Sequence, residues 1–383
     1  MNKHVLILSE AVGAGHTKAA EAIQQGIALL APSVDTRVLE LGRELHPIAA
    51  GLICHVYLEM ITRYPGLWRK VYDRGQARPM AVWEQACIHK MMHRTVKSIV
   101  ARSHPDLVVC THPFSSSSVA RLKRAGLPLR LCTVITDFHG HGAWVQPEVD
   151  RYLVPSEEVG SQLQEMGVPD TKIRITGLPL PVQFRVKHNK REMRRKLGLA
   201  EMPTVLVMGG SLGLGGIEEV ARILAKWRDS LQIVLCAGHN DSLRQALCAA
   251  FQHPHIHVLG FVDGISQWMD AADWLITKPG GMTCAEALAK RLPLFMYQPL
   301  PGHEESNCAF LTRHKLAVRM DTEPEVDRWV QTLLRYPYEL SRLVRNMERC
   351  KQTADPLAPA RSALDFLMAE DGEARKERRL WRQ

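Results

Sequence analysis

A strand, a glycine turn and the start of a helix follow one another in the sequence Trp274-Leu275-Ile276-Thr277-Lys278-Pro279-Gly280-Gly281-Met282-Thr283-Cys284-Ala285-Glu286-Ala287. The apolar residues 274–276 predict the strand, and the Gly-Gly pair predicts a tight turn before the helix. The first N–H groups of a helix have no partner inside it, so its N-terminus can bind a phosphate group. We therefore expect an anion site at Gly280, Gly281 and Thr283.

Glu286 lies one turn into this helix. From there its carboxylate could reach the sugar of a nucleotide whose diphosphate rests on the helix end. A plainer interpretation is that Thr283 and Glu286, spaced as T-x-x-E, form only a capping box. An acidic and amide cluster follows about one helix later, at Glu304, Glu305 and Asn307. The two segments together favour a nucleotide-sugar site over a capping box.

Short apolar segments alternate with helical stretches along the chain, the pattern of a parallel sheet covered on both faces. The first series of expected strands comprises Val5–Leu8, Thr36–Leu39, Leu107–Cys110, Leu131–Ile135, Arg151–Val154 and Ile173–Thr176. The second series comprises Val205–Met208, Gln232–Cys236, Ile256–Leu259, Trp274–Ile276 and Leu294–Tyr297. The sequence therefore predicts an α/β fold of two Rossmann-like parallel-sheet domains facing a central cleft, where the ligands of such sheets usually bind.

The segment Arg185–Lys196 holds seven cations and one Glu, and we expect it to link the two series and to begin a helix. An N-terminal acceptor- and membrane-binding domain is expected at residues 1–184. A C-terminal nucleotide-sugar-binding domain is expected at residues 185–345. Residues 346–383 are expected to form a C-terminal helix and a basic, frayed tail.

Length and composition predict a globular protein of two ordinary domains, since the 383 residues are 46% hydrophobic and 23% charged. Nine cysteines occur singly without a C-x-x-C pair, which indicates reduced thiols, a cytoplasmic location and no zinc site. The chain passes directly from Lys3 into strand-like residues, so we expect no signal peptide. No apolar run approaches the roughly 18 residues that a membrane-spanning helix needs.

The net charge of +9 is concentrated in one part of the chain, because residues 44–130 hold 13 Lys or Arg and five acidic residues. Between residues 48 and 72, apolar side chains are interleaved with cations, and Trp68, Arg69 and Lys70 are expected on a surface that binds anionic lipid. An alternative is a helix pair that packs its apolar face into the domain. The sequence holds no helix-turn-helix, zinc-finger or RNA-binding signature, so no nucleic-acid partner is expected.

Two glycine-rich loops follow expected strands, where ligands of parallel sheets bind. The first, Gly13-Ala14-Gly15-His16, is neither a dinucleotide fingerprint nor a Walker loop. Its His16 stands at a helix start, and an imidazole with an unperturbed pKa of about 6.5 suits a general base, although a single histidine is more often a structural hydrogen-bonding group. The second loop, Gly209–Gly216, would let backbone N–H groups approach a phosphate, or would serve only the packing of a helix on a strand.

Further landmarks are Tyr64-Pro65, Leu67-Trp68, Tyr72, Pro105-Asp106, Thr111-His112-Pro113-Phe114, Thr136-Asp137, His141, Trp144, Val149-Asp150-Arg151-Tyr152, Thr176-Gly177-Leu178-Pro179, Lys278-Pro279-Gly280-Gly281, Pro301-Gly302, Glu304 and Asn307. In these landmarks, which run in family order from residue 5 to about 310, the chain resembles the bacterial processive diacylglycerol glucosyltransferases and the plant monogalactosyldiacylglycerol synthases. Both are members of glycosyltransferase family 28, with the two-Rossmann architecture called GT-B.

The resemblance implies an inverting, metal-independent transfer of a hexose from a UDP-sugar to diacylglycerol or a glycosyl-diacylglycerol, by an enzyme bound peripherally to the inner face of the cell membrane. It implies that His16 deprotonates the acceptor hydroxyl and that Glu286 holds the ribose. Glu304 and Asn307 would contact the hexose. Further residues expected at the donor site are Gly15, Gly210, Ser211, Gly213, Phe261, Gly280, Gly281 and Thr283. Asp137 and His141 are expected to shape the acceptor side, and no cofactor is expected beyond the donor substrate itself.

The chain departs from the family pattern at His303, where the family usually has Gln, and at Ser306, where it usually has Glu. The resemblance therefore does not identify the donor sugar. An extra histidine in the segment Asp137-Phe138-His139-Gly140-His141 raises the alternative of a metal site, for which no further ligands with suitable spacing appear. Three other functions remain open: transfer of N-acetylglucosamine to a lipid-linked peptidoglycan precursor, epimerisation of UDP-N-acetylglucosamine, and sensing of a UDP-sugar without turnover.

Overall fold

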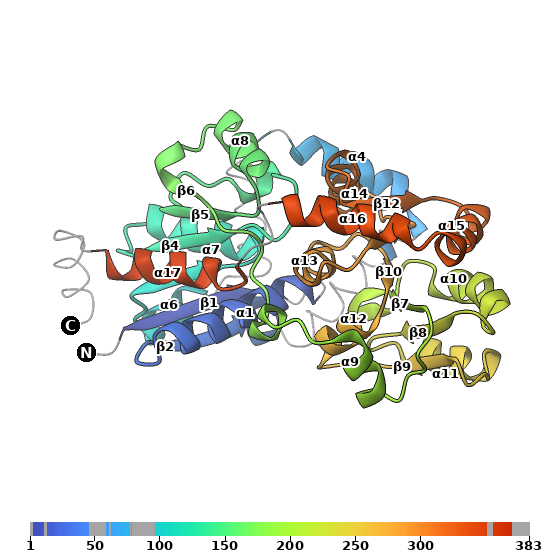
Figure 1. Ribbon diagram of the computed structural model, residues 1–383. Coiled ribbons are helices and arrows are strands. Elements are labelled where there is room, and N and C mark those ends of the chain that lie inside the picture. Colours follow the sequence, from blue (N-terminus) through green and yellow to red (C-terminus); the bar gives the residue numbers. More distant parts are fainter. Residues whose placement is uncertain are drawn as a thin grey trace. The chain divides into compact units, whose positions relative to one another are not determined.

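The computed structural model describes residues 3–10, 14–45, 59–60, 63–76, 78, 96–350 and 355–369. The chain divides into two compact units: unit 1 is Met1–Val182 with Asp355–Gln383, and unit 2 is Gln183–Ala354. Each unit contains one six-stranded parallel sheet with helices packed on it (Figure 1). The expectation of two Rossmann-like parallel sheets is confirmed, and every strand expected from the sequence is present with ends within one residue of the expected ones.

The sheet of unit 1 has the strand order β2-β1-β3-β4-β5-β6. Its strands are β1 (His4–Ser9), β2 (Asp35–Glu40), β3 (Leu107–Cys110), β4 (Leu131–Val134), β5 (Arg151–Val154) and β6 (Ile173–Ile175). Its helices are α1 (Gly15–Leu30), α2 (Leu41–Leu45), α4 (Pro65–Gln76), α6 (Val96–Ser103), α7 (Pro113–Arg124), α8 (Glu157–Glu165) and α17 (Ala358–Met368), with the 3-10 helices η1 (Gly142–Trp144) and η2 (Asp170–Lys172).

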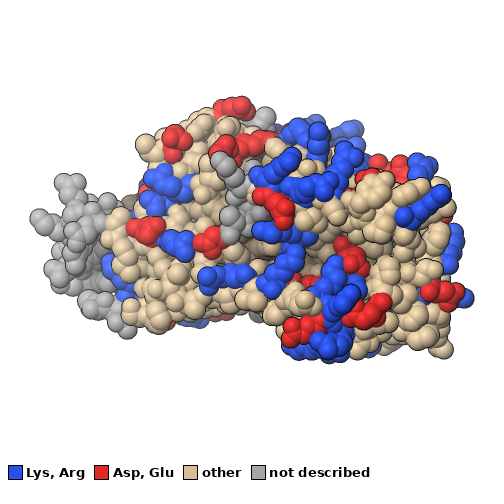
Figure 2. All heavy atoms as spheres, viewed as in Figure 1, with Lys and Arg blue, Asp and Glu red and all other residues tan. Residues whose placement is uncertain are grey.

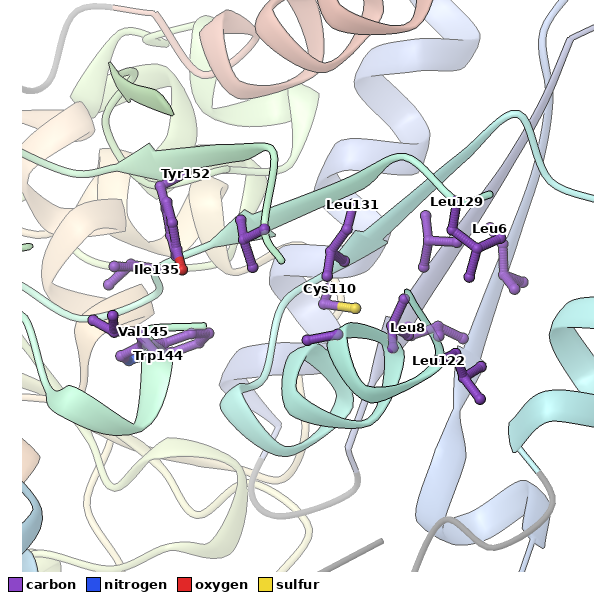
Figure 3. Close-up of a cluster of buried hydrophobic side chains, with 14 of the residues drawn as sticks. Leu6, Leu8, Cys110, Leu122, Leu129, Leu131, Ile135, Trp144, Val145 and Tyr152 are labelled. Carbon is purple, nitrogen blue, oxygen red and sulfur yellow. The ribbon is translucent and has the colours of Figure 1, made fainter. Parts of the chain in front are cut away.

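Both faces of this sheet are buried, which explains the unbroken apolar run of β1. Leu6 and Leu8 point to one face and join an apolar cluster with Trp144 (Figure 3). Val5 and Ile7 point to the other face, where side chains of α1 and α17 cover them. In a strand that is buried on both faces, polar and apolar residues do not alternate. Only its short length and the glycines near it distinguish its sequence from that of a buried helix.

Helix α17 belongs to the core of unit 1, although the whole of unit 2 precedes it in the sequence. It approaches α1 so closely that a Cβ atom at Gly26 would lie 2.6 Å from the Cβ of Ala360. The Phe366 ring contacts two guanidinium groups, with its centroid 4.1 Å from Arg130 Cζ and 4.5 Å from Arg151 Cζ. Arg130 also donates hydrogen bonds to carbonyl groups at the end of α17, which fixes the helix end on the sheet.

The sheet of unit 2 has the strand order β12-β11-β10-β7-β8-β9. Its strands are β7 (Thr204–Met208), β8 (Gln232–Cys236), β9 (Ile256–Leu259), β10 (Trp274–Thr277), β11 (Leu294–Tyr297) and β12 (Ala317–Met320). Its helices are α9 (Lys190–Lys196), α10 (Ile217–Leu224), α11 (Asp241–Ala250), α12 (Ile265–Ala271), α13 (Gly281–Lys290), α14 (His303–Arg313), α15 (Glu323–Arg335) and α16 (Tyr338–Arg349), with the 3-10 helices η4 (Gly210–Leu212) and η5 (Ala225–Trp227). The 3-10 helix η3 (Val182–Arg185) lies at the border of the two units.

The strand β12 is not among those expected from the sequence. It lies at the edge of the sheet, and its exposed Arg319 interrupts an already short apolar run. Edge strands often carry charged residues, so their sequence pattern is weaker than that of the strands between them.

Candidate functional site

The side chain of His16 is held by groups that follow two neighbouring strands of unit 1. Its Nδ1 lies 2.8 Å from the carbonyl oxygen of Thr111 and 2.9 Å from Thr136 Oγ1. The Thr111 hydroxyl donates a hydrogen bond in return to the carbonyl oxygen of His16, at 2.9 Å. Because a carbonyl oxygen can only accept, we assign the proton of the neutral imidazole to Nδ1. Nε2 then carries the lone pair, which is the arrangement that a general base needs.

A second histidine lies against the first. The rings of His16 and His112 are 4.5 Å apart in an edge-on arrangement. His112 Nδ1 accepts the backbone N–H of Phe114 at 3.1 Å and so caps the N-terminus of α7. From the sequence, Thr111 and His112 are only landmarks, and no role is predicted for Thr136. The positions of Thr111 and Thr136 after two expected strands could have indicated that both lie near His16. The carboxyl ends of neighbouring parallel strands meet at one edge of the sheet.

The loop after β4 is attached to helix α4 through His141. His141 Nδ1 accepts the N–H of Ala143 at 3.0 Å, so its Nε2 carries the proton and donates to the carbonyl oxygen of Tyr72, at 3.1 Å. A Cβ atom at Gly142 would lie 1.8 Å from the carbonyl oxygen of Arg78, so only glycine allows this approach. One ring nitrogen of His141 therefore caps η1 (Gly142–Trp144), and the other holds α4.

The neighbouring His139 also pairs with protein groups. Its Nε2 lies 2.6 Å from Gln76 Nε2, and its Nδ1 lies 3.2 Å from Gln162 Nε2. Asp137 is partly buried at the start of the same loop. The contacts of His139 fix this loop at the carboxyl end of β4, and the role of Asp137 and His141 on the acceptor side stays a prediction.

Helix α4 carries a surface that is both basic and apolar. Arg69 and Lys70 are exposed, whereas Trp68 is partly buried. The exposed apolar side chains nearby are Tyr64 (63% exposed) and Leu67 (58% exposed). Figure 2 shows Lys and Arg side chains gathered over α4. Much of the segment 48–72 lies outside the described residues, and in the described ranges no helix combines the length and the apolar character that crossing a membrane requires.

The glycine-rich loop 209–216 of unit 2 lies between the end of β7 and the start of α10. The backbone has positive φ angles at Gly210 (68°), Gly213 (65°), Gly215 (86°) and Gly216 (70°), which favour glycine over other residues. A Cβ atom at Gly213 would in addition lie 2.7 Å from the carbonyl oxygen of Ala237. The loop therefore presents backbone rather than side chains at this edge of the sheet, and Ser211 sits in its η4 turn.

The second glycine turn opens helix α13. Its N-cap residue is Gly280, and no side chain caps the helix. Thr283 is therefore the third residue inside the helix, and the capping box considered from the sequence is wrong. Glu286 lies in the next turn and is 2% exposed. Its contact with a ribose stays a prediction.

Three polar side chains tie the start of α13 to α14. Lys278 Nζ donates a hydrogen bond to Glu304 Oε1, and the other oxygen of Glu304 accepts the N–H of Leu300 at 3.0 Å. Asn307 Nδ2 donates to the carbonyl oxygen of Pro279 at 3.2 Å. Glu304 and Asn307 are completely buried. The sequence predicts both residues in the site but predicts no role for Lys278.

Burial also determines the state of a thiol in this region. Burial, together with the carboxylate of Glu304, raises the pKa of Cys284 well above its ordinary value. Cys284 therefore stays protonated at neutral pH and is no nucleophile.

An aromatic pair lies beyond the glycine-rich loop, after β8 and β9. The rings of His239 and Phe261 are stacked, with centroids 4.1 Å apart and an interplanar angle of 13°. Phe261 is 43% exposed, although it is a large apolar side chain. The donor-site candidates of unit 2 thus follow β7, β9, β10 and β11 at their carboxyl ends, and His239 of the aromatic pair follows β8. Gly15 and His16 lie in unit 1, at the start of α1.

Comparison with known families matches each half of the chain. The sequence model described as "Monogalactosyldiacylglycerol (MGDG) synthase" matches residues 16–180, and the one described as "Glycosyltransferase family 28 C-terminal domain" matches residues 204–357. The chain is 30% identical over 381 residues to the processive diacylglycerol beta-glucosyltransferase of Bacillus cereus (strain AH187), covering 97% of this chain and 94% of that protein. It is 29% identical over 381 residues to the protein of the same name from Bacillus anthracis (strain A0248), with the same coverage.

Solved structures with a similar fold include proteins in complex with UDP or a UDP-sugar. Anabaena Alr3699/HepE in complex with UDP and glucose has a TM-score of 0.58 at 13% identity and covers 96% of this chain and 99% of its own. Acinetobacter baumannii MurG has a TM-score of 0.59 at 16% identity, and UDP-GlcNAc 2-epimerase from Neisseria meningitidis has 0.60 at 12% identity. Each of these two covers 95% of this chain and 99% of its own. At these identities the likeness establishes a common two-sheet fold of the GT-B type and nothing beyond it.

Proposed function

We propose, since the chain belongs to the glycosyltransferase family of monogalactosyldiacylglycerol synthases and processive diacylglycerol glucosyltransferases, that it transfers a hexose from a UDP-sugar to diacylglycerol or a glycosyl-diacylglycerol. The observation that carries this proposal is the extent of the likeness to the diacylglycerol glucosyltransferases. It spans 97% of the chain and therefore includes both the surroundings of His16 and those of Glu304. Two of the structures with a similar fold also contain UDP or a UDP-sugar.

His16 is the base of the proposed reaction. Its Nε2 takes the proton of the acceptor hydroxyl, whose oxygen forms the new bond to the anomeric carbon. The bond from that carbon to the diphosphate breaks, and its electron pair leaves with UDP. Attack from the face opposite the leaving group inverts the configuration. The imidazolium that forms is stabilised by the Thr111 carbonyl oxygen, 2.8 Å from Nδ1.

The donor binds to unit 2 in this proposal. Negative charge grows on the diphosphate as it leaves, and the N–H groups of loop 209–216 and of the α13 N-terminus can stabilise it without a metal ion. They are effective because their positions are fixed before the reaction begins. Buried Glu304 and Asn307 hold hexose hydroxyl groups, Glu286 holds the ribose, and Phe261 offers an exposed ring for the nucleotide.

Unit 1 binds the acceptor at a membrane surface. The exposed cations Arg69 and Lys70 on α4 are attracted to anionic lipid head groups, and Tyr64 and Leu67 can enter the interface between head groups and acyl chains. His141 and Gly142 hold this helix against the loop that also carries Asp137. We infer a peripheral position of the enzyme on the membrane that contains its lipid acceptor.

The other functions considered from the sequence receive no specific support. The UDP-GlcNAc 2-epimerase structures among the similar folds share 12–13% identity with the chain, which establishes the fold alone. The family match instead favours diacylglycerol over a peptidoglycan precursor as acceptor.

The proposal is tested by incubating the protein with liposomes that contain diacylglycerol and an anionic lipid, and with radiolabelled UDP-glucose, UDP-galactose or UDP-N-acetylglucosamine in separate reactions. We expect one of these donors to yield labelled glycolipid, with UDP released in equal amount. A label that stays in the water phase as an epimerised sugar, or that enters only a muramyl-pentapeptide lipid, contradicts the proposal. Binding of UDP without any transfer would indicate a sensor.

A further inference from the structure

Lys278 lies where the two glycine turns of unit 2 come together. A Cβ atom at Gly210 would lie 3.2 Å from Lys278 Cε and 4.0 Å from its Nζ. A Cβ atom at Gly280 would lie 3.9 Å from the same Nζ, and one at Gly215 would lie 3.0 Å from Lys278 Cβ. The side chain therefore runs along loop 209–216, and the ammonium group lies beside both turns, in space that larger residues at Gly210 and Gly280 would occupy.

The charge of this ammonium group is the only full positive charge that the two turns supply. Loop 209–216 and the segment 278–286 contain no other Lys or Arg. The present partner of Lys278 is Glu304, whose side chain is 1% exposed. Glu304 has a second donor, the N–H of Leu300, so it does not depend on Lys278 alone. Lys278 keeps 18% of its side chain exposed and can therefore be reached by a ligand.

We propose that Lys278 binds the diphosphate of the donor, and that donor binding exchanges its ion pair with Glu304 for one with the diphosphate. This inference rests on the proposed function, because it assumes a nucleoside-diphosphate sugar at the two glycine turns. The exchange leaves Glu304 Oε1 as an acceptor for hydroxyl groups of the hexose. A buried carboxylate deprived of its cation requires such a new donor, so recognition of the diphosphate and of the hexose become linked.

Lys278 also has a part in the chemical step. The leaving diphosphate gains negative charge as the bond to the anomeric carbon breaks, and a nearby ammonium group stabilises that charge more than it stabilises the bound donor. A lysine can follow the moving charge, since its ammonium is a compact charge on a flexible stem. This differs from a purely structural role, in which the ion pair with Glu304 would persist and only hold α13 against α14.

The first experiment compares Lys278→Met with the matched control Lys226→Met, an exposed lysine of η5 in the same unit. Titration calorimetry gives the affinities for UDP and for uridine, which has no phosphate. Loss of a charge-assisted hydrogen bond should lower the ratio of UDP affinity to uridine affinity roughly 10- to 100-fold in Lys278→Met. The ratio should not change in Lys226→Met, and Lys278→Arg should keep most of it. An unchanged ratio in folded Lys278→Met overturns the inference.

The second experiment uses Glu304→Gln, for which the two roles predict opposite results. If donor binding exchanges the ion pair, the loss of the Glu304 charge in this variant frees Lys278 for the diphosphate. UDP should then bind as tightly as in the unchanged protein or more tightly. The added affinity of UDP-hexose over UDP should disappear. If the pair is structural, UDP binding should fall together with the melting temperature, which overturns the inference. Failure of the unchanged protein to bind UDP at all would instead contradict the proposed function.

Discussion

The hydrogen bonds around His16 determine which of its nitrogens can act as a base. Nδ1 faces a carbonyl oxygen and a hydroxyl, so the lone pair is on Nε2. The sequence gives the position of His16 at a helix start but contains no information on this orientation. Thr136 is 120 positions away in the chain, and only the pairing of β1, β3 and β4 brings it to the imidazole.

Replacement of His16 by alanine should remove most of the transfer activity and leave the UDP affinity nearly unchanged. A positioned general base accelerates a reaction roughly 100- to 10,000-fold, and His16 lies in unit 1, whereas the donor residues lie in unit 2. The measurement is the rate of glycolipid formation beside calorimetry with UDP. His4→Ala is a suitable control, because His4 lies at the opposite end of β1 and pairs with Asp35. A variant that keeps more than a tenth of the rate would show that another group is the base.

Replacement of Glu286 by glutamine should weaken UDP binding, since a carboxylate forms a stronger hydrogen bond to a ribose hydroxyl than an amide does. The structure excludes the capping role, so the variant should not lose a helix cap. The sharper measurement compares UDP with 2′-deoxy-UDP and 3′-deoxy-UDP. For the unchanged protein one of the two should bind about tenfold more weakly than UDP, and in Glu286→Gln this difference should shrink. If Glu286→Gln loses the same affinity for all three ligands, Glu286 does not contact the ribose.

At the scale of single elements, sequence patterns predict most strands because each is a short apolar run followed by a turn. They fail for β12, where an edge position and Arg319 weaken the pattern. They also leave α4 undecided between a membrane surface and a packed helix. The structure combines both, since Tyr72 and His141 attach one side of the helix while Tyr64 and Leu67 stay exposed.

Charge reversal on α4 should weaken membrane binding. In Arg69→Glu/Lys70→Glu, two attractive charges become repulsive, and each cation near an anionic surface contributes about 1 kcal/mol. Cosedimentation with liposomes should fall steeply, and the UDP affinity should stay the same. The control Arg342→Glu/Arg345→Glu makes an equal change of charge on the exposed face of α16 in unit 2. Equal loss in both variants would mean that net charge rather than α4 governs binding.

Whole-molecule organisation is where the sequence is least informative. The alternation of strands and helices predicts two sheets, and this is confirmed. It does not predict that α17 packs against β1 and α1, because an apolar helix at the end of a chain can cover either sheet. Contacts such as the one between Gly26 and Ala360 exist only after the chain has returned to unit 1.

Truncation of Phe366 should therefore destabilise unit 1 although it lies near the C-terminus. Removal of a buried aromatic ring typically costs about 3–5 kcal/mol, and here it also removes the contacts with Arg130 and Arg151. Hydrogen exchange should become faster in β1 and α1 of Phe366→Ala and stay unchanged in β7 and β10. Met368→Ala in the same helix is the control, since Met368 is 51% exposed. Faster exchange in both units would contradict an effect confined to unit 1.

The packing of α17 on unit 1 also has a consequence for how the protein folds during its synthesis on the ribosome. Unit 2 is continuous in sequence, so its sheet can form as soon as residue 354 has been synthesised and has left the exit tunnel. Unit 1 begins first but is finished last, because α1 covers only part of the sheet face with Val5 and Ile7, and the rest stays open until α17 emerges. During most of translation the half that carries His16 is an incomplete sheet with an open apolar face, which is the kind of surface that chaperones bind.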